Sequence, residues 1–188
     1  MRLTKMMMMT GTAAALLISS AVAQTSEVGK RAENQQDRIA QGVKSGSLTA
    51  GETSNLEKKE AAINQEVHVD RTLNGGKLTA AERKQVNAQQ NQLSKQIYKD
   101  KHNTATQHYG KNEVDSRREN QQDRIANGIA SGKLSAAQAS RLEKGEAAIN
   151  QEVRTDRSLN GGKLTAAERK QVNRQQNRMS GKIYRAKH

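Results

Sequence analysis

The chain has 188 residues and contains no Phe, Trp, Pro or Cys, while Lys and Arg outnumber Asp and Glu by 32 to 19. The absence of Cys excludes a disulfide-stabilised fold, and the net charge of +13 favours anionic partners. Since low hydrophobicity and high net charge also occur in disordered chains, only a regular apolar pattern can indicate that this chain folds.

The first residues have the pattern of a secretory signal peptide. Arg2 and Lys5 precede an apolar or small stretch that ends in the small-x-small cleavage pattern at 21–23. A single membrane anchor is the alternative interpretation, but the run is short and ends at the cleavage pattern. We therefore predict a signal peptide at 1–23 and an exported mature protein, periplasmic or secreted, with no transmembrane span after cleavage.

The rest of the chain is a tandem duplication. Residues 33–102 align on 119–188 with a constant offset of 86 and no gap, and 50 of these 70 positions are identical. So close a copy implies a recent duplication. Agreement between the copies therefore says little about which residues the function requires, and the repetition itself is the informative feature.

A shorter repeat inside each copy marks the starts of helices. A Thr or Ser stands three residues before a Glu or Gln, which is the spacing of a capping box at a helix N-terminus. The four boxes are Thr49 with Glu52, Thr79 with Glu82, Ser135 with Gln138, and Thr165 with Glu168. Apolar residues follow each hydroxyl residue at offsets of 7, 14 and 18, which return to one side of a helix. Glycines that suit a left-handed helix end precede the boxes: Gly46, Gly75, Gly76, Gly132, Gly161 and Gly162.

These signals predict an all-α fold with two tandem three-helix units built from capped helical hairpins. The expected helices are 31–45, 50–73, 80–100, 117–131, 136–159 and 166–186, the fourth starting at a box formed by Ser116 and Glu119. The expected parts are a signal peptide at 1–23, a first helical repeat unit at 24–102, a linker and start of the next helix at 103–118, and a second unit at 119–188. Because each apolar stripe is narrow, we expect the fold to need all three helices of a unit, pairing of the units, or a dimer.

The segment LNGGKLTAAE, at 73–82 and again at 159–168, resembles part of a calcium-binding EF-hand loop. Such a loop needs oxygen ligands at positions 1, 3 and 5, Gly at 6 and Glu at 12. Placing Glu82 at position 12 fits Gly76 at 6 but leaves no carboxylate at 1, 3 and 5, and starting at Asp70 puts Ala81 at 12. We interpret the segment as a capped turn and keep a calcium site as the alternative. Its ligands would come from Asp70, Asn74, Glu82, Asp156, Asn160 and Glu168.

Few other residues could form a catalytic or metal site. The histidines are His68, His102, His108 and His188, and no H-E-x-x-H motif, phosphate-binding glycine loop or serine elbow occurs. We interpret His102 and His108 as solvated loop residues, with a transition-metal site as the alternative. We interpret Glu57 and Glu60 as ordinary charged residues on a helix surface. We therefore predict neither an enzyme nor a cofactor.

A basic stripe on the last predicted helix is the feature that most directly suggests a function. Lys170, Arg174, Arg178 and Lys182 recur every four residues on the last helix, on the side away from its apolar residues. The matching positions of the first copy are Lys84, Ala88, Gln92 and Gln96, so the copies differ most in cationic character. One interpretation is a solvated face whose charges suit the helix C-terminus. The other is a surface that binds an anionic partner.

The four Leu-Thr or Leu-Ser starts also resemble the periplasmic LTxxQ-motif proteins of the Spy and CpxP type. Leu134-Ser135-Ala136-Ala137-Gln138 comes nearest to the motif, while the other three segments carry Glu in place of Gln. The tandem 86-residue unit and the NGG turn are not part of that pattern. The resemblance implies a stress-related chaperone or envelope sensor that binds clients on a cationic, partly apolar helical surface without ATP.

Together these features predict an exported, non-enzymatic helical binding protein, chaperone-like in action. It would hold acidic or unfolded partners, or an anionic envelope component, on Lys170, Arg174, Arg178 and Lys182 beside exposed residues of the apolar stripes. Export and the presence of only three Tyr disfavour nucleic acid as a partner. Two alternatives stay open, namely a metal-responsive envelope protein with calcium bound at the turns, and a structural envelope protein that associates with itself as a homo-oligomer.

Overall fold

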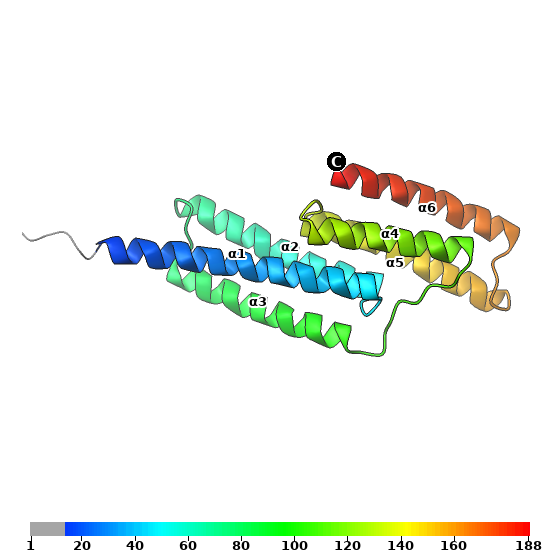
Figure 1. The fold of residues 1–188 in the computed structure, drawn as a ribbon, viewed down its shortest axis with the longest axis horizontal. Helices are drawn as coiled ribbons and strands as arrows, with labels where there is room; N and C mark the ends of the chain where they lie inside the picture. Colours follow the sequence, from blue (N-terminus) through cyan, green and yellow to red (C-terminus); the bar gives the residue numbers. More distant parts are fainter. Residues whose placement is uncertain (1–13) are drawn as a thin grey trace, which may run out of the picture.

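The structure is a computed structural model that describes residues 14–188, with side chains from Glu27 onward (Figure 1). Residues 1–13 of the predicted signal peptide lie outside the described residues. Among the helices of the described part, none is both long enough and apolar enough to cross a membrane.

The described chain consists of six helices and no strands, which confirms the predicted all-α class (Figure 1). The helices are α1 (Ala14–Ser45), α2 (Ala50–Leu73), α3 (Ala80–Lys101), α4 (Glu113–Ala130), α5 (Ala136–Leu159) and α6 (Ala166–Lys187). The bounds of α2 and α5 are as predicted, and those of α3 and α6 differ from the prediction by one residue at the C-terminal end.

All four predicted capping boxes form, at the starts of α2, α3, α5 and α6. In the box of α3, the Glu82 backbone N–H donates to Thr79 Oγ1 at 3.3 Å and the Thr79 N–H donates to Glu82 Oε2 at 2.7 Å. The preceding turn passes through Gly75 and Gly76 with φ of 61° and 87°, a left-handed conformation that glycine adopts without a steric cost. Local sequence alone therefore accounts for these helix starts.

Two predicted helix starts are wrong. The first helix begins before residue 31, since α1 already includes Ala14. The fourth begins at Glu113 because Asn112, not Ser116, is the N-cap, and its side chain accepts a hydrogen bond from the Asp115 N–H at 3.1 Å. Ser116 lies inside the first turn. Asn is as good an N-cap as Ser, and the earlier start lets α4 bury Val114 in the core.

The helices of the two copies pack side by side in opposite directions. The most extensive pairing joins α2 to α5, and the second joins α1 to α4. Helix α3 lies on α1 and α2, while α6 lies on α4 and α5 at the opposite side of the bundle (Figure 1). Equivalent residues of the two copies meet in the middle, where the Ser54 and Ser140 hydroxyls each donate to the other residue's backbone carbonyl.

The predicted apolar stripes form one core shared by both copies. Every stripe residue is buried, and the most enclosed include Leu56, Ile97 and Ile183. Ile39 of α1 and Ile125 of α4 belong to the same core. Of the three ways in which such narrow stripes could be covered, the structure shows the pairing of the two copies. The core lies along the centre of the bundle, so the outer faces of α3 and α6 remain for contact with solvent or partners.

Candidate functional site

The predicted basic stripe lies on the outer face of α6. Lys170, Arg174, Arg178 and Lys182 are all exposed, while Val172, Met179 and Ile183 on the opposite side of the helix are buried. None of the four cations forms an ion pair or a hydrogen bond with another described residue, in contrast to the buried Arg118 of α4. The stripe covers about 18 Å of the helix axis, from the rise of 1.5 Å per residue.

The matching face of α3 provides an internal comparison. Its Lys84, Ala88 and Gln92 are exposed like their counterparts, and Gln96 donates to Asp100 Oδ1 at 2.8 Å. The two helices have the same length and the same cap. The cationic character of the outer face is therefore a property of α6 and not of the fold.

One part of the predicted mechanism is wrong, because no apolar stripe residue is exposed beside the cations. Those residues form the core, where each buried side chain stabilises the packing of the helices. The large apolar side chains that are exposed lie elsewhere, mostly near helix C-termini: Val69, Leu73, Tyr98, Leu159 and Tyr184. Only Tyr184 belongs to α6, and its ring stacks on His188 at a centroid distance of 4.4 Å. Contacts on this face are therefore polar and electrostatic.

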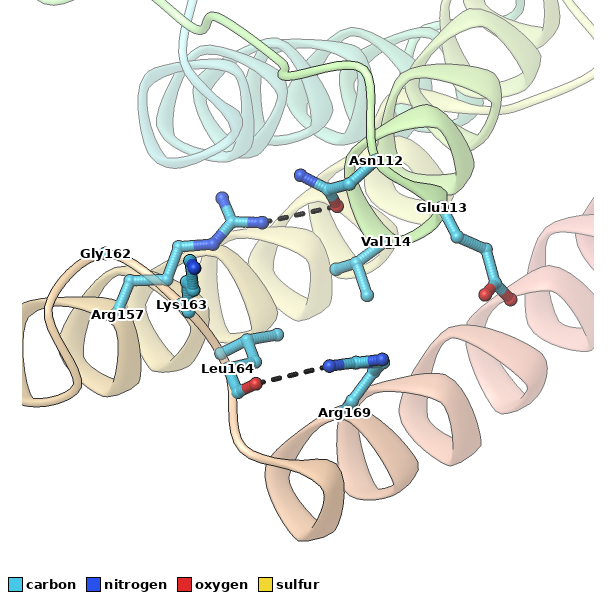
Figure 2. Close-up of a pocket in the computed structure, with 8 residues that line it drawn as sticks. All are labelled: Asn112, Glu113, Val114, Arg157, Gly162, Lys163, Leu164 and Arg169. Atoms are coloured by element: carbon cyan, nitrogen blue, oxygen red, sulfur yellow. Dashed lines mark hydrogen bonds between the residues drawn. The ribbon is translucent and has the colours of Figure 1, made fainter.

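A second group of cations lines a pocket of about 360 Å³ beside the start of α6 (Figure 2). Arg157 points toward Asn112, to whose Oδ1 it donates at 3.4 Å, and it also forms an ion pair with Asp115 at 3.0 Å. Arg169 donates to the Leu164 carbonyl at 3.4 Å. Two of the three basic side chains of this pocket, which also include Lys163, are thus engaged within the chain, unlike those of the α6 stripe.

At the turns, the candidate calcium ligands are used to hold the chain. The Asn74 amide nitrogen donates to both carboxylate oxygens of Glu82, at 2.9 and 3.0 Å, and Asn160 does the same to Glu168. A hydrogen bond from the Thr79 backbone lowers the pKa of Glu82. Each carboxylate therefore faces a nitrogen donor rather than further oxygen ligands. In the described part of the chain, no group of three or more His, Asp or Glu side chains is arranged to hold a metal ion.

Asp70 and Asp156 lie close to the same turns, and His102 and His108 lie elsewhere. Partial desolvation and the nearby carboxylates of Glu82 and Glu66 raise the pKa of Asp70, and Asp156 is the equivalent residue of the second copy. His102 stacks on Tyr98, and His108 lies at 2.8 Å from Thr106 Oγ1, both exposed to solvent. The structure does not bring the two histidines together in a hydrogen-bonded pair.

The interpretation of Glu57 and Glu60 as surface residues is wrong. Both side chains are fully buried, as are those of the equivalent Glu143 and Glu146. Glu57 and Glu60 belong to α2, and Glu143 and Glu146 belong to α5, the helix that packs most extensively on α2. Gln36 of α1 and Gln122 of α4 each donate one hydrogen bond, to Glu57 and Glu143, at 3.1 and 3.0 Å. A helical projection of α2 could have indicated this, because Glu60 lies within the stripe of Leu56, Ile63 and Val67.

Burial alters the protonation of these carboxyl groups. It raises the pKa of Glu57 to about 8 and those of Glu60 and Glu146 to about 7, and it raises the pKa of Glu143 as well. The proximity of Glu143 to Glu57 and Glu146 adds to the effect. The group therefore binds protons at neutral pH, because a charged carboxylate is costly to bury without a partner.

No protein-family model, curated protein or solved structure matches the chain. The resemblance to the LTxxQ-motif proteins accordingly stays a prediction. The site that the geometry favours is the α6 stripe, because it is the one predicted group of functional side chains that is exposed, close together and without partners inside the chain.

Proposed function

We propose that the protein is an exported, non-enzymatic helical binding protein that holds acidic partners on the outer face of α6. The observation that carries this proposal is the exposure of Lys170, Arg174, Arg178 and Lys182 without any internal partner. The partner is an acidic or unfolded protein segment, or an anionic polymer of the cell envelope. In each case its charges come from carboxylate or phosphate groups.

The mechanism is electrostatic capture. Long-range attraction concentrates an acidic segment near the stripe, and Arg side chains then form bidentate contacts with individual carboxylates. Since the apolar residues Val172, Met179 and Ile183 of α6 are buried, affinity comes from many weak exposed ion pairs and falls as salt screens them. An acidic segment with charges repeating at about 6 Å, the rise of four helical residues, matches the spacing of the cations.

The internal comparison with α3 gives the test. The variant R174A/R178Q/K182Q carries the α3 residues at three stripe positions, so it keeps good helix formers and removes three charges. A fluorescent oligoglutamate peptide would be titrated with wild type and variant at low and high salt, with binding followed by anisotropy. We expect the variant to bind about tenfold more weakly at low salt, from roughly 0.5 kcal/mol per exposed ion pair.

The reciprocal variant A88R/Q92R/Q96K places the same charges on α3 and controls for net charge. Adding it to R174A/R178Q/K182Q restores the total charge of the chain. If binding requires only positive charge, the combined variant regains full affinity from a new location, which nuclear magnetic resonance shifts on α3 would reveal. Equal affinity and equal salt dependence of wild type and R174A/R178Q/K182Q would refute the proposal.

A further inference from the structure

The two copies differ in how the joint between the first and second helix of each is covered. The segment 103–112 crosses the joint between α1 and α2, where the Gln107 N–H donates to the Gly46 carbonyl at 2.8 Å. The Gln107 side chain is buried and accepts a hydrogen bond from Asn150 Nδ2 at 3.2 Å. An extended piece of the chain is thus held by one backbone carbonyl and one asparagine.

Arg118 and Tyr109 complete the contacts of this covered joint, which we call the filled place. Arg118 is buried and donates from Nε to Asn150 Oδ1 at 2.6 Å, and the Tyr109 ring covers its guanidinium at 5.0 Å. The carboxyl group of Glu146 lies close enough to Arg118 for the positive charge of the guanidinium to lower the pKa of Glu146. Gln107 and Tyr109, two residues apart on the segment, therefore occupy a place whose walls are Gly46, Asn150 and Arg118.

The offset of 86 residues locates the equivalent place in the other copy. Gly46 corresponds to Gly132, Asn150 to Asn64, Arg118 to Ala32, and Glu146 to Glu60. All four of these residues line a single pocket of about 250 Å³ at the joint between α4 and α5. The duplication therefore predicts the position of this pocket from the contacts of the filled place.

Among the described residues, no segment covers this second place. A Cβ added to Gly46 would lie 2.4 Å from the Gln107 carbonyl oxygen, whereas a Cβ added to Gly132 would meet nothing within 4 Å. The Asn64 side chain is correspondingly exposed, while Asn150 is only 3 % exposed beneath Gln107. Ala32 stands where the other copy has Arg118, and its smaller side chain leaves additional room in the pocket.

The pocket is also lined by a buried carboxyl group. Glu60 is fully buried, and Asn64 lies close enough to lower its pKa against the effect of burial. In the filled place the equivalent Glu146 is likewise buried without a hydrogen-bond partner, and there the charge of Arg118 lowers its pKa. Because Ala32 stands in place of Arg118, recognition of a ligand here depends on Asn64, the counterpart of Asn150.

We propose that the pocket formed by Ala32, Glu60, Asn64 and Gly132 binds an extended peptide segment with a glutamine followed two residues later by a tyrosine. The ligand repeats what the chain's own Gln107 and Tyr109 do in the filled place. Its backbone N–H donates to the Gly132 carbonyl, its glutamine accepts from Asn64, and its tyrosine ring lies in the room that Ala32 leaves. This inference concerns a different surface from the α6 stripe and does not depend on the proposed function.

A peptide with the sequence of residues 103–111, NTATQHYGK, is the probe. It would be titrated into the ¹⁵N-labelled full chain, with binding followed by calorimetry and by backbone amide shifts. We expect saturable binding of one peptide per chain, with the largest shifts around Gly132 and Asn64. N64A should weaken binding about two- to tenfold, the effect of one hydrogen bond. A32R should strengthen it, because the new guanidinium gives the tyrosine the platform that Arg118 provides in the filled place.

The matched control is N150A, which alters the filled place and should leave affinity for the added peptide unchanged. A peptide with Ala in place of its glutamine should lose affinity for wild type but show little further loss with N64A. Absence of saturable binding to both wild type and A32R would overturn the inference. So would shifts centred on Gly46 with sensitivity to N150A alone, since the peptide would then be displacing the chain's own segment.

Discussion

The Ser54 hydroxyl donates to the Ser140 backbone carbonyl at 2.9 Å, and the Ser140 hydroxyl donates to the Ser54 carbonyl at the same distance. The two residues are equivalent positions of the duplicated sequence, 86 residues apart. A reciprocal contact between equivalent residues is what a two-fold axis between two identical subunits produces. The two copies are therefore related by an approximate two-fold axis that passes between these serines, within a single chain.

This symmetry predicts equal effects of equivalent substitutions. S54A and S140A should each lower the free energy of unfolding by about 1 kcal/mol, because each removes one partly buried hydrogen bond. S54L and S140L should cost more, since α2 and α5 approach closely there and the larger side chain has no space. Urea denaturation of the four variants checks this. Clearly unequal effects at the two positions would contradict the symmetric contact.

The buried glutamates predict a stability that falls as the pH rises. In the folded chain the pKa is about 8 for Glu57 and about 7 for Glu60 and Glu146, whereas in the unfolded chain these carboxyl groups release their protons near pH 4.5. The stabilisation is complete below about pH 4.5 and is lost as the pH rises through 8, by roughly 1.4 kcal/mol per group for each unit of pKa difference. Thermal unfolding measured between pH 5 and 9 checks the direction.

A single carboxyl group can be tested in the same experiment. E60Q should raise the free energy of unfolding by about 1–3 kcal/mol at pH 8 and change it little at pH 4.5, because the amide stays neutral at both. The exposed Glu33 provides the control, and E33Q should leave the profile unchanged. A profile for E60Q that parallels the wild type throughout would contradict the raised pKa.

The ion pair between Asp115 and Arg118 predicts non-additive substitutions. Both side chains are almost fully buried and lie 2.8 Å apart, and the hydrogen bonds from Arg157 lower the pKa of Asp115 against the effect of burial. D115A should destabilise the chain by about 3–5 kcal/mol, because it leaves a buried guanidinium without its counter-charge. D115A/R118A should recover much of this loss, since the first copy has Gly29 and Ala32 at these positions. A double variant no more stable than D115A would contradict this account.

The turns predict a defined response to calcium. Because Asn74 and Asn160 present amide nitrogens to Glu82 and Glu168, about 1 mM calcium, enough for weak extracellular sites, should leave the thermal midpoint of the wild type unchanged. N74D/N160D should lower that midpoint at neutral pH, because a carboxylate then faces each glutamate. Saturable heat from calcium added to the wild type, measured by calorimetry, would establish the alternative interpretation as a metal-responsive protein.

The sequence by itself determined the secondary structure at most helix boundaries. Capping boxes act over four residues and left-handed glycines over one, so Thr79 with Glu82 and Gly75 with Gly76 specify their turn without long-range help. The apolar spacing likewise identified core residues in α2, α3, α5 and α6. At the start of α4 the capping-box rule selected Ser116, whereas Asn112 is the N-cap, and the earlier start brings Val114 into the core.

Only the tertiary structure decided what lies between the copies. Periodicity gives the face that a helix buries but not the surface that covers it. The helical projection of α2 places Glu60 within the apolar stripe, but the pairing of α2 with α5 that covers Glu57 and Glu60 could not be obtained from the pattern. The same holds for the segment 103–112, whose place over Gly46 depends on the contact of Gln107 with Asn150, 43 residues further along the chain. The α6 stripe is the opposite case, because exposed charges need no tertiary partner and their helical spacing already placed them on one face.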